Sequence, residues 1–141
     1  MADAPKGTVL GFDFGLQYIG VAAGQTITST AQALPTLKAK EGQPNWSEVE
    51  KIIEEWQAKY LVIGNPLNMD GSASELSTRA KKFANRLHGR FGLPFEMWDE
   101  RLSSFEARGE ILENKKSKAF RQQNVDGISA RLILESWLRE H

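Results

Sequence analysis

The sequence predicts an α/β fold in which a five-stranded mixed sheet is flanked by helices. Two observations lead to this class. Three strand-like segments follow one another between residues 8 and 37, and the short first link favours antiparallel pairing. From residue 46 onward, amphipathic helical patterns alternate with short apolar runs, which is typical of parallel strands joined by crossover helices.

The antiparallel part comes first in the chain. Residues 8–14 and 18–24 are rich in apolar side chains, and only Gly15-Leu16-Gln17 separates them, so we expect a hairpin. Residues 27–37 are rich in threonine and alanine and predict a third strand.

The middle of the chain changes to a helical period. Apolar residues at i, i+3, i+4 and i+7 predict an amphipathic helix over residues 46–58; they are Val49, Ile52, Ile53 and Trp56. Residues 60–63 are wholly apolar and end at Gly64, as a central parallel strand does. Residues 65–74 contain turn-forming residues and predict a loop.

The last part of the chain predicts one strand and three helices. A buried stripe predicts a helix over residues 74–91, and residues 95–98 predict the fifth strand. Capping-box spacing predicts a helix over 103–114, and a final helix is expected over 125–140. Between these helices, residues 115–124 predict a polar, basic loop. Strand 8–14 is then expected at the centre of the sheet, beside strand 60–63.

Length and composition predict an ordinary globular protein. The 141 residues fit a single domain over 1–141, and we expect residues 1–7 to be flexible. The 18 basic residues balance the 18 acidic ones, which argues against a uniformly basic binding surface. The absence of cysteine excludes disulfides and thiolate metal sites and is compatible with a cytoplasmic location. No apolar run approaches 18 residues, so we expect no membrane partner.

Three acidic residues lie where predicted elements begin or end. Asp13 ends the first strand, Glu100 follows strand 95–98, and Asp126 lies in the first turn of the last helix. Because ligands of α/β sheets gather at the carboxyl ends of parallel strands, we expect these acids to form one site. Carboxylates favour Mg²⁺ or Mn²⁺, which can assist phosphodiester hydrolysis. Asp99 is the reserve ligand, since strand alternation directs it away from Glu100. Ordinary surface carboxylates are the alternative interpretation.

Several motifs, in the same order and spacing, resemble the YqgF family, also called RuvX. They are Phe12-Asp13-Phe14-Gly15, Ile19-Gly20-Val21-Ala22, Gly64, Pro66-Leu67-Asn68-Met69-Asp70-Gly71, Asp99-Glu100-Arg101-Leu102-Ser103 and Val125-Asp126. The resemblance covers nearly the whole chain and implies a RuvC-like, ribonuclease H-like fold. It also implies that Asp13, Glu100 and Asp126 are the catalytic metal ligands. Where the family usually has Gly-Leu-Pro, this chain has Gly64-Asn65-Pro66.

The resemblance implies a metal-dependent nuclease that uses Mg²⁺ or Mn²⁺. The favoured role is 5′-end processing of pre-16S rRNA in ribosome biogenesis, with pre-rRNA and ribosomal particles as partners. The alternatives are a Holliday junction resolvase that acts on branched DNA, and a non-catalytic RNA-binding factor. A resolvase needs two active sites, so both a monomer and a weak homodimer stay open.

Substrate contacts are expected around the acids. The predicted contact residues are Gly15, Asn68, Arg101, Lys115, Lys116, Lys118 and Arg121. Gly15 is either a turn glycine or a point of close approach for a phosphate backbone. The basic residues of loop 115–124 would hold phosphates without reading bases. A second group of cations lies on the predicted helix 74–91 and could either contact nucleic acid or form an ordinary solvated face. Its members are Arg79, Lys81, Lys82, Arg86 and Arg90.

Overall fold

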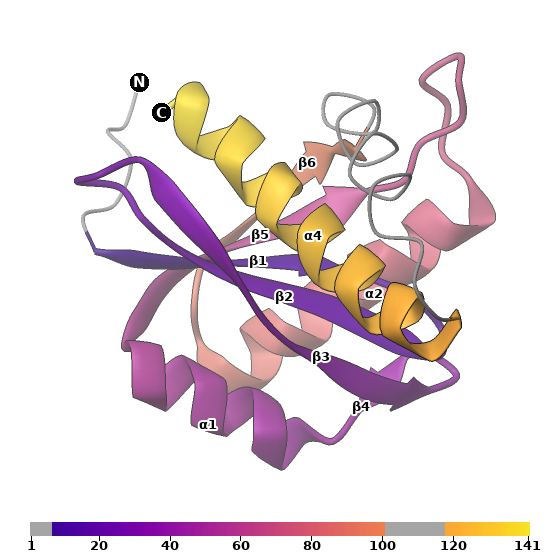
Figure 1. The fold of residues 1–141 in the computed structure, drawn as a ribbon. Helices are drawn as coiled ribbons and strands as arrows, with labels where there is room; N and C mark the ends of the chain where they lie inside the picture. The colour runs from indigo at the N-terminus through magenta and orange to yellow at the C-terminus, as the bar shows by residue number, and fades with distance from the viewer. Residues whose placement is uncertain (1–6, 101–117) are drawn as a thin grey trace.

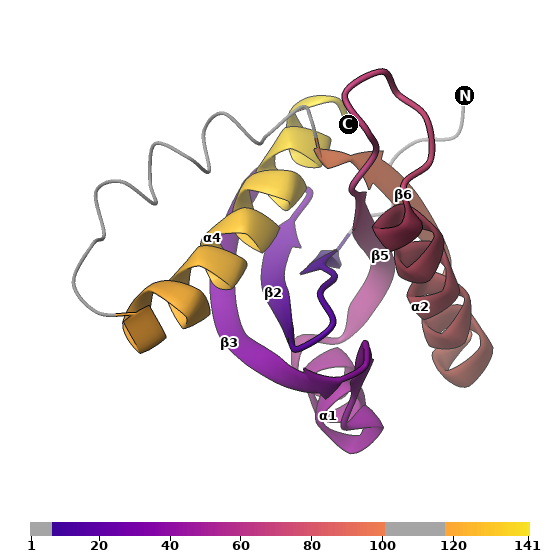
Figure 2. The same ribbon diagram turned by 90° about the vertical axis from the view of Figure 1, so that its right-hand side faces the viewer.

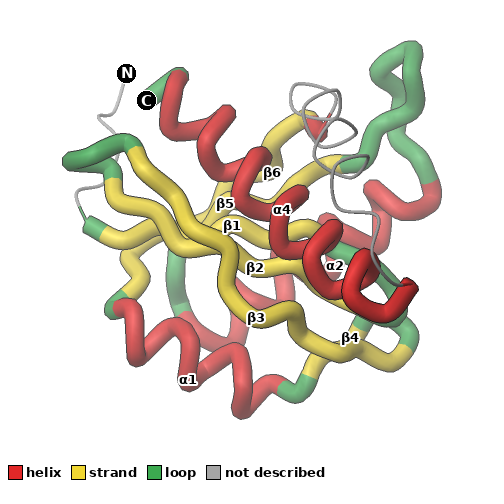
Figure 3. The backbone as a smooth tube through the Cα atoms, viewed as in Figure 1, coloured by secondary structure: helices red, strands yellow, loops and turns green. Residues whose placement is uncertain are grey.

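The computed structural model describes residues 7–100 and 118–141, with the backbone alone for 118–126. Six strands form one sheet in the order β4-β3-β2-β1-β5-β6 (Figure 1). The strands are β1 Thr8–Asp13, β2 Tyr18–Gln25, β3 Thr30–Lys40, β4 Gln43–Pro44, β5 Ala58–Asn65 and β6 Phe95–Asp99. The helices are α1 Trp46–Trp56, α2 Glu75–Phe91 and α4 Lys118–Arg139. Figure 3 shows the same path as a tube, with the loop between β5 and α2 projecting beyond the sheet.

The predicted fold class is confirmed, but the predicted number of five strands is wrong. The additional strand β4 has only two residues, and it pairs with the end of β3 through Ala39 and Pro44. Glu41 and Gly42 reverse the chain between them with φ angles of 52° and 81°. Two residues show no alternating pattern, which is why the sequence did not reveal this strand.

Strand β1 occupies the centre of the sheet, as predicted. It pairs antiparallel with β2 on one side and parallel with β5 on the other. Strand β6 then pairs parallel with β5. The three parallel strands therefore end at the same edge of the sheet, where Asp13, Asn65 and Asp99 are the last strand residues.

Strand alternation divides the buried residues between two helical layers. Helices α1 and α2 cover one face, and α4 crosses the other (Figures 1 and 2). On the face of α1 and α2, Phe12 of β1 packs edge-on against Phe83 of α2, with ring centroids 5.6 Å apart. On the opposite face, Val9 and Val62 pack in one cluster with Trp137 of α4.

Helix α4 lies close to the sheet because two strand positions lack side chains. A Cβ atom on Gly11 of β1 would come within 3.0 Å of the Leu134 Cβ atom. One on Gly24 of β2 would come within 2.9 Å of Leu134 Cδ2. The first distance is tighter than nearly all real Cβ contacts and the second is shorter than real ones, so the two glycines allow α4 to pack at this depth.

The last helix begins earlier than predicted. Helix α4 starts at Lys118 rather than near residue 125, so the predicted loop 115–124 is wrong for residues 118–124. These residues are mostly good helix formers and include neither proline nor glycine, so the helix continues through them. The predicted helix 103–114 and the flexibility predicted for residues 1–6 lie outside the described residues. None of the helices in the described ranges is both long and apolar enough to cross a membrane.

Leu134 should be a main determinant of stability, because its side chain is fully buried between α4 and the sheet. Leu134→Ala is expected to lower the free energy of unfolding by about 2–5 kcal/mol, measured by urea denaturation. Leu16→Ala is the control, since Leu16 is 41% exposed and should change the stability by less than about 1 kcal/mol. Equal losses in the two variants would contradict this packing.

Candidate active site

The buried neighbours of Asp13 in the chain determine the side of the sheet to which its side chain points. Its neighbours Phe12 and Phe14 are 1% and 7% exposed and pack in the cluster of α1 and α2. Alternation therefore directs the half-buried Asp13 to the α4 face. Phe12 pairs with Ile63 of β5, so Asp13 lies beside Gly64, the next residue of that strand.

The side chain of Glu100 lies next to Asp13, over the end of β5. Its side chain lies over Gly64, because a Cβ atom there would be 2.8 Å from Glu100 Oε1 and 2.9 Å from Glu100 Cγ. The same Cβ atom would be 2.7 Å from Ile133 Cδ1 of α4. Any side chain at position 64 would compete with Glu100 for this space.

The Asp13 and Glu100 carboxyl groups share a hydrogen bond. Burial raises the pKa of the Glu100 carboxyl, the hydrogen bond with Asp13 acts in the opposite direction, and the nearby charge of Asp99 raises that pKa further. Two carboxyl groups can share a hydrogen bond only when one of them is protonated. The structure thus brings two of the three predicted acids together, with Asp99 close enough for its charge to act on Glu100.

The remaining predicted residues are only partly covered by the structure. The backbone at position 126 lies in α4, one helical turn before Ala130, and the Asp126 side chain is not described. The same holds for the side chains of Lys118 and Arg121. Arg101, Lys115 and Lys116 lie outside the described residues. Their roles, and that of Asp126, stay predictions.

The donor atoms fit a hard divalent cation. Asp13 and Glu100 present only carboxylate oxygens, the ligands that Mg²⁺ and Mn²⁺ prefer. The close approach of the two carboxyl groups marks a position where a cation would relieve the repulsion between their charges. Among the described side chains, no group of three or more acids or histidines is placed to hold a metal. A complete site would therefore need a ligand outside that set, and Asp126 is the predicted one.

Another acid on the α4 face, Glu96, has a structural role. Its Oε1 atom accepts hydrogen bonds from Tyr60 Oη at 3.2 Å and Trp137 Nε1 at 3.3 Å. His141 Nε2 lies 3.9 Å from the same oxygen. Burial, together with the charge of Glu96, raises the pKa of Tyr60. These contacts tie the carboxyl end of α4 to the sheet and distinguish Glu96 from the pair near Gly64.

Two of the predicted substrate residues have structural roles that the sequence also allows. Asn68 Nδ2 donates to Ser72 Oγ at 3.1 Å and so closes the loop between β5 and α2. A Cβ atom on Gly15 would overlap the carbonyl oxygen of Tyr18, so the turn after β1 requires glycine there. Contact of either residue with substrate stays a prediction.

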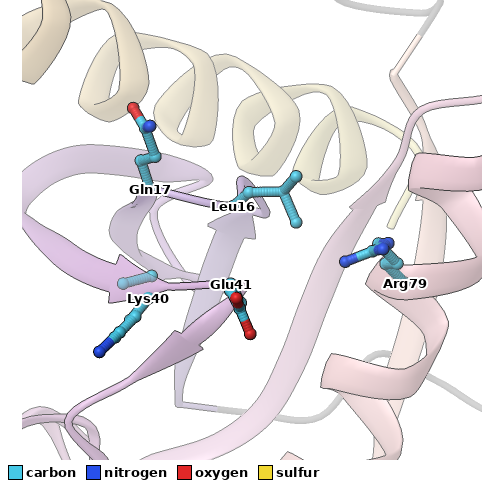
Figure 4. Close-up of a pocket in the computed structure, with 6 residues that line it drawn as sticks. Leu16, Gln17, Lys40, Glu41 and Arg79 are labelled. Atoms are coloured by element: carbon cyan, nitrogen blue, oxygen red, sulfur yellow. The ribbon is translucent and has the colours of Figure 1, made fainter.

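A groove of about 730 Å³ opens next to the end of β1, and the sequence did not reveal it. It lies between the turn after β1, the turn before β4, and α2. Figure 4 shows Leu16 and Arg79 facing each other across it. Lys40 adds a second cation and Glu41 an acid to its lining. Backbone hydrogen bonds from Ala39 N to Gln17 O and from Gly42 N to Leu16 O join the two turns. These contacts depend on the meeting of distant turns, which a local pattern does not show.

Comparison with known proteins gives consistent matches over nearly the whole chain. The sequence model of a family described as "RuvX: Holliday junction resolvase" matches residues 7–140. A protein of Actinobacillus pleuropneumoniae named "Putative pre-16S rRNA nuclease" is 59% identical over 130 residues, which are 92% of this chain and 95% of that protein. A protein of Mannheimia succiniciproducens with the same name is 58% identical over 132 residues, 94% of each chain.

Solved structures resemble the fold at low sequence identity. Thermus thermophilus RuvC in complex with a Holliday junction substrate matches with a TM-score of 0.55 and 15% identity, covering 94% of this chain and 96% of that one. The yeast mitochondrial Holliday junction resolvase matches with a TM-score of 0.57 and 11% identity, covering 98% and 80%. At these identities the likeness establishes a RuvC-like fold.

The raised pKa of Glu100 predicts how stability depends on pH in the absence of divalent metal. A carboxyl whose pKa is higher in the folded state contributes stability below its unfolded pKa and loses it as the pH rises through the folded value. Glu100→Gln keeps a side chain that can form a hydrogen bond with Asp13 and removes the buried charge. We expect this variant to be more stable than wild type at pH 7 in EDTA, by about 1.4 kcal/mol for each unit of pKa shift.

The difference should shrink as the pH falls to about 4, which is near the ordinary pKa of glutamate. Urea denaturation at both pH values measures it. Glu50→Gln on the exposed side of α1 is the control and should show no such dependence. A Glu100→Gln protein less stable than wild type at pH 7 would contradict the assignment.

Proposed function

Because the chain belongs to the RuvX family, we propose that it is a divalent-metal-dependent nuclease that hydrolyses phosphodiester bonds of structured nucleic acid. Its centre is the carboxylate pair of Asp13 and Glu100 at the carboxyl end of β1, with Asp126 of α4 as the third ligand. The hydrogen-bonded pair over Gly64 is the observation on which this proposal rests.

The pair alone would repel a phosphodiester, since both groups carry negative charge when ionised. Mg²⁺ or Mn²⁺ bound by Asp13, Glu100 and Asp126 would supply positive charge for the scissile phosphate and would lower the pKa of a water molecule. Asp13 contributes a rigid position, because β1 is paired on both sides. Glu100 contributes a half-buried carboxylate that lies over Gly64.

Cations around the site support nucleic acid as the substrate. Arg79 and Lys40 line the groove that opens beside the end of β1. Arg101, Lys115, Lys116, Lys118 and Arg121 belong to the segment between Glu100 and Asp126. Phosphate contacts of this kind position a substrate without reading its sequence. Gly15 and Asn68 complete the proposed contact set.

We infer that the substrate is the precursor of 16S rRNA. The relatives at 58–59% identity carry that activity in their names, and each match covers more than nine-tenths of both chains. The ribosomal particle that carries the precursor is then the proposed partner, with Mg²⁺ or Mn²⁺ as the cofactor.

A four-way DNA junction is the second candidate, because the family description names a Holliday junction resolvase. Resolution of a junction requires two cuts and hence two active sites. This function would therefore need a homodimer, whereas trimming of a single RNA end needs only a monomer.

The direct test compares wild type with Asp13→Asn on a pre-16S rRNA fragment and on a four-way DNA junction, each with Mg²⁺ or Mn²⁺. Wild type should cut the rRNA fragment only in the presence of metal, and Asp13→Asn should lose about 100-fold or more in rate. Glu50→Gln is a matched control on exposed α1 and should cut normally.

The two substrates separate the candidates. Preferential cutting of the junction by a dimeric wild type would replace rRNA processing with junction resolution. Binding of either substrate without any cutting would contradict nuclease function and favour a non-catalytic RNA-binding factor.

A further inference from the structure

A second cavity lies at the end of β5, on the side away from Glu100. It has a volume of about 430 Å³, within the range of roughly 300–1,000 Å³ that is usual for small-molecule pockets. Its lining comes from the last residue of β5, the following loop, α2 and β6: Asn65, Leu67, Thr78, Lys81, Lys82 and Met97.

Asn65 lines this cavity, and the oxygen of its side-chain amide is buried beside it. Its Oδ1 atom is buried and, within the part of the chain that the structure describes, accepts no hydrogen bond. Buried polar atoms almost always have a partner, so an acceptor without one requires an explanation. A rotation of the side-chain amide would bring this oxygen to the cavity, where an N–H group of a ligand would complete its hydrogen bonding.

The walls of the cavity combine apolar surface with positive charge. Leu67 and Met97 supply apolar contacts. Lys81 and Lys82 stand on the exposed side of α2 at the cavity, and Lys81 Nζ lies 5.9 Å from the centre of the Phe95 ring. From residue 76 to residue 91, α2 carries five cations and no acid. Apolar walls with cations suit a flat nucleobase joined to phosphate.

The loop that forms one wall is held by its own hydrogen bonds. Ser72 donates to Asp70 Oδ1 from its backbone N–H at 2.9 Å and from its hydroxyl at 2.6 Å. The Asn68 backbone N–H donates to the Ser72 carbonyl oxygen at 2.9 Å. Ser74, which caps α2, also donates its hydroxyl to the Pro66 carbonyl oxygen. The wall is therefore formed before any ligand binds.

The cavity and the proposed active site lie on opposite faces of the sheet at the end of β5. Gly64 and Asn65 are consecutive in β5, so they face opposite sides of the sheet. Glu100 covers Gly64 on one side, and the cavity begins at Asn65 on the other. A strand with one phosphate at the carboxylate pair can therefore place a nearby base around the end of β5.

We propose that this cavity binds one unpaired nucleobase of the substrate, with Asn65 contacting the base edge and Lys81 and Lys82 holding the adjacent phosphate. The proposal rests on nucleic acid being the substrate. Adenine is the preferred base, since an asparagine amide matches its N6 donor and N7 acceptor. The base must be single-stranded, because a base inside a duplex cannot enter such a cavity.

Binding in EDTA tests the pocket without cleavage. The probes are a fluorescent adenine oligoribonucleotide of about 12 nucleotides and an abasic oligomer with the same backbone. Wild type should bind the adenine oligomer about tenfold more tightly, as expected for one base contact of this kind. Asn65→Leu should reduce this preference, because it keeps the apolar wall for the base and loses the amide contact.

Matched variants separate base binding from charge and from folding. Lys82→Ala should weaken binding of both probes and reduce the salt slope by about one, whereas Lys51→Ala on α1 should change neither. Asn65→Leu removes an unpaired buried acceptor, so its thermal midpoint should equal or exceed that of wild type. Thr78→Phe, which fills the cavity from the exposed side of α2, should also remove the preference for the adenine oligomer.

The binding results distinguish a failure of the pocket proposal from a failure of the nuclease proposal. If the Asn65→Leu and Thr78→Phe variants prefer the adenine oligomer as strongly as wild type does, the pocket proposal is overturned and the nuclease proposal stays intact. Equal binding of the two probes by wild type also overturns the pocket proposal and leaves the nuclease proposal intact. A wild type that binds neither probe nor a pre-16S rRNA fragment overturns both proposals.

Discussion

The proposed active site depends on the absence of a side chain at position 64. Glu100 lies in the space that a Cβ atom would occupy there, and Ile133 of α4 borders the same space. This position brings its carboxyl group to Asp13, which the central strand β1 holds in place. Two acids so close together favour a shared proton in the absence of metal, and a divalent cation would satisfy both of them when ionised. One glycine thereby couples the packing of α4 to the chemistry proposed for the site.

The end of β5 also divides the proposed functions between two faces. On the α4 face, the Glu100 carboxylate lies over Gly64. On the α2 face, the next residue, Asn65, lines the cavity. Between them, the parallel strands β1, β5 and β6 all end at one edge of the sheet. The proposed chemistry and the proposed base contact are thus one residue apart along a single strand.

The sequence predicted the strand order around β1 and the meeting of Asp13 with Glu100 because both follow from periodicity and parallel pairing. It did not reveal β4, whose two residues have no period, or the earlier start of α4. The role of Gly64 was also missed, since a glycine at a strand end has several local explanations and the contact comes from Glu100, which follows a different strand. Asn65 was noted only as a departure from the family, because burial without a partner is a property of the folded chain.

Titration with Mn²⁺, followed by electron paramagnetic resonance, tests the central relation between Gly64, Glu100 and metal most directly. Gly64→Ala should weaken Mn²⁺ binding by about tenfold or more, since the new methyl group displaces the Glu100 carboxylate. Gly89→Ala is the matched control, because a Cβ atom there would meet nothing within 4 Å, and it should bind Mn²⁺ as wild type does. Equal affinity in wild type and Gly64→Ala, with both folded, would show that the metal does not depend on this pair and would contradict the account.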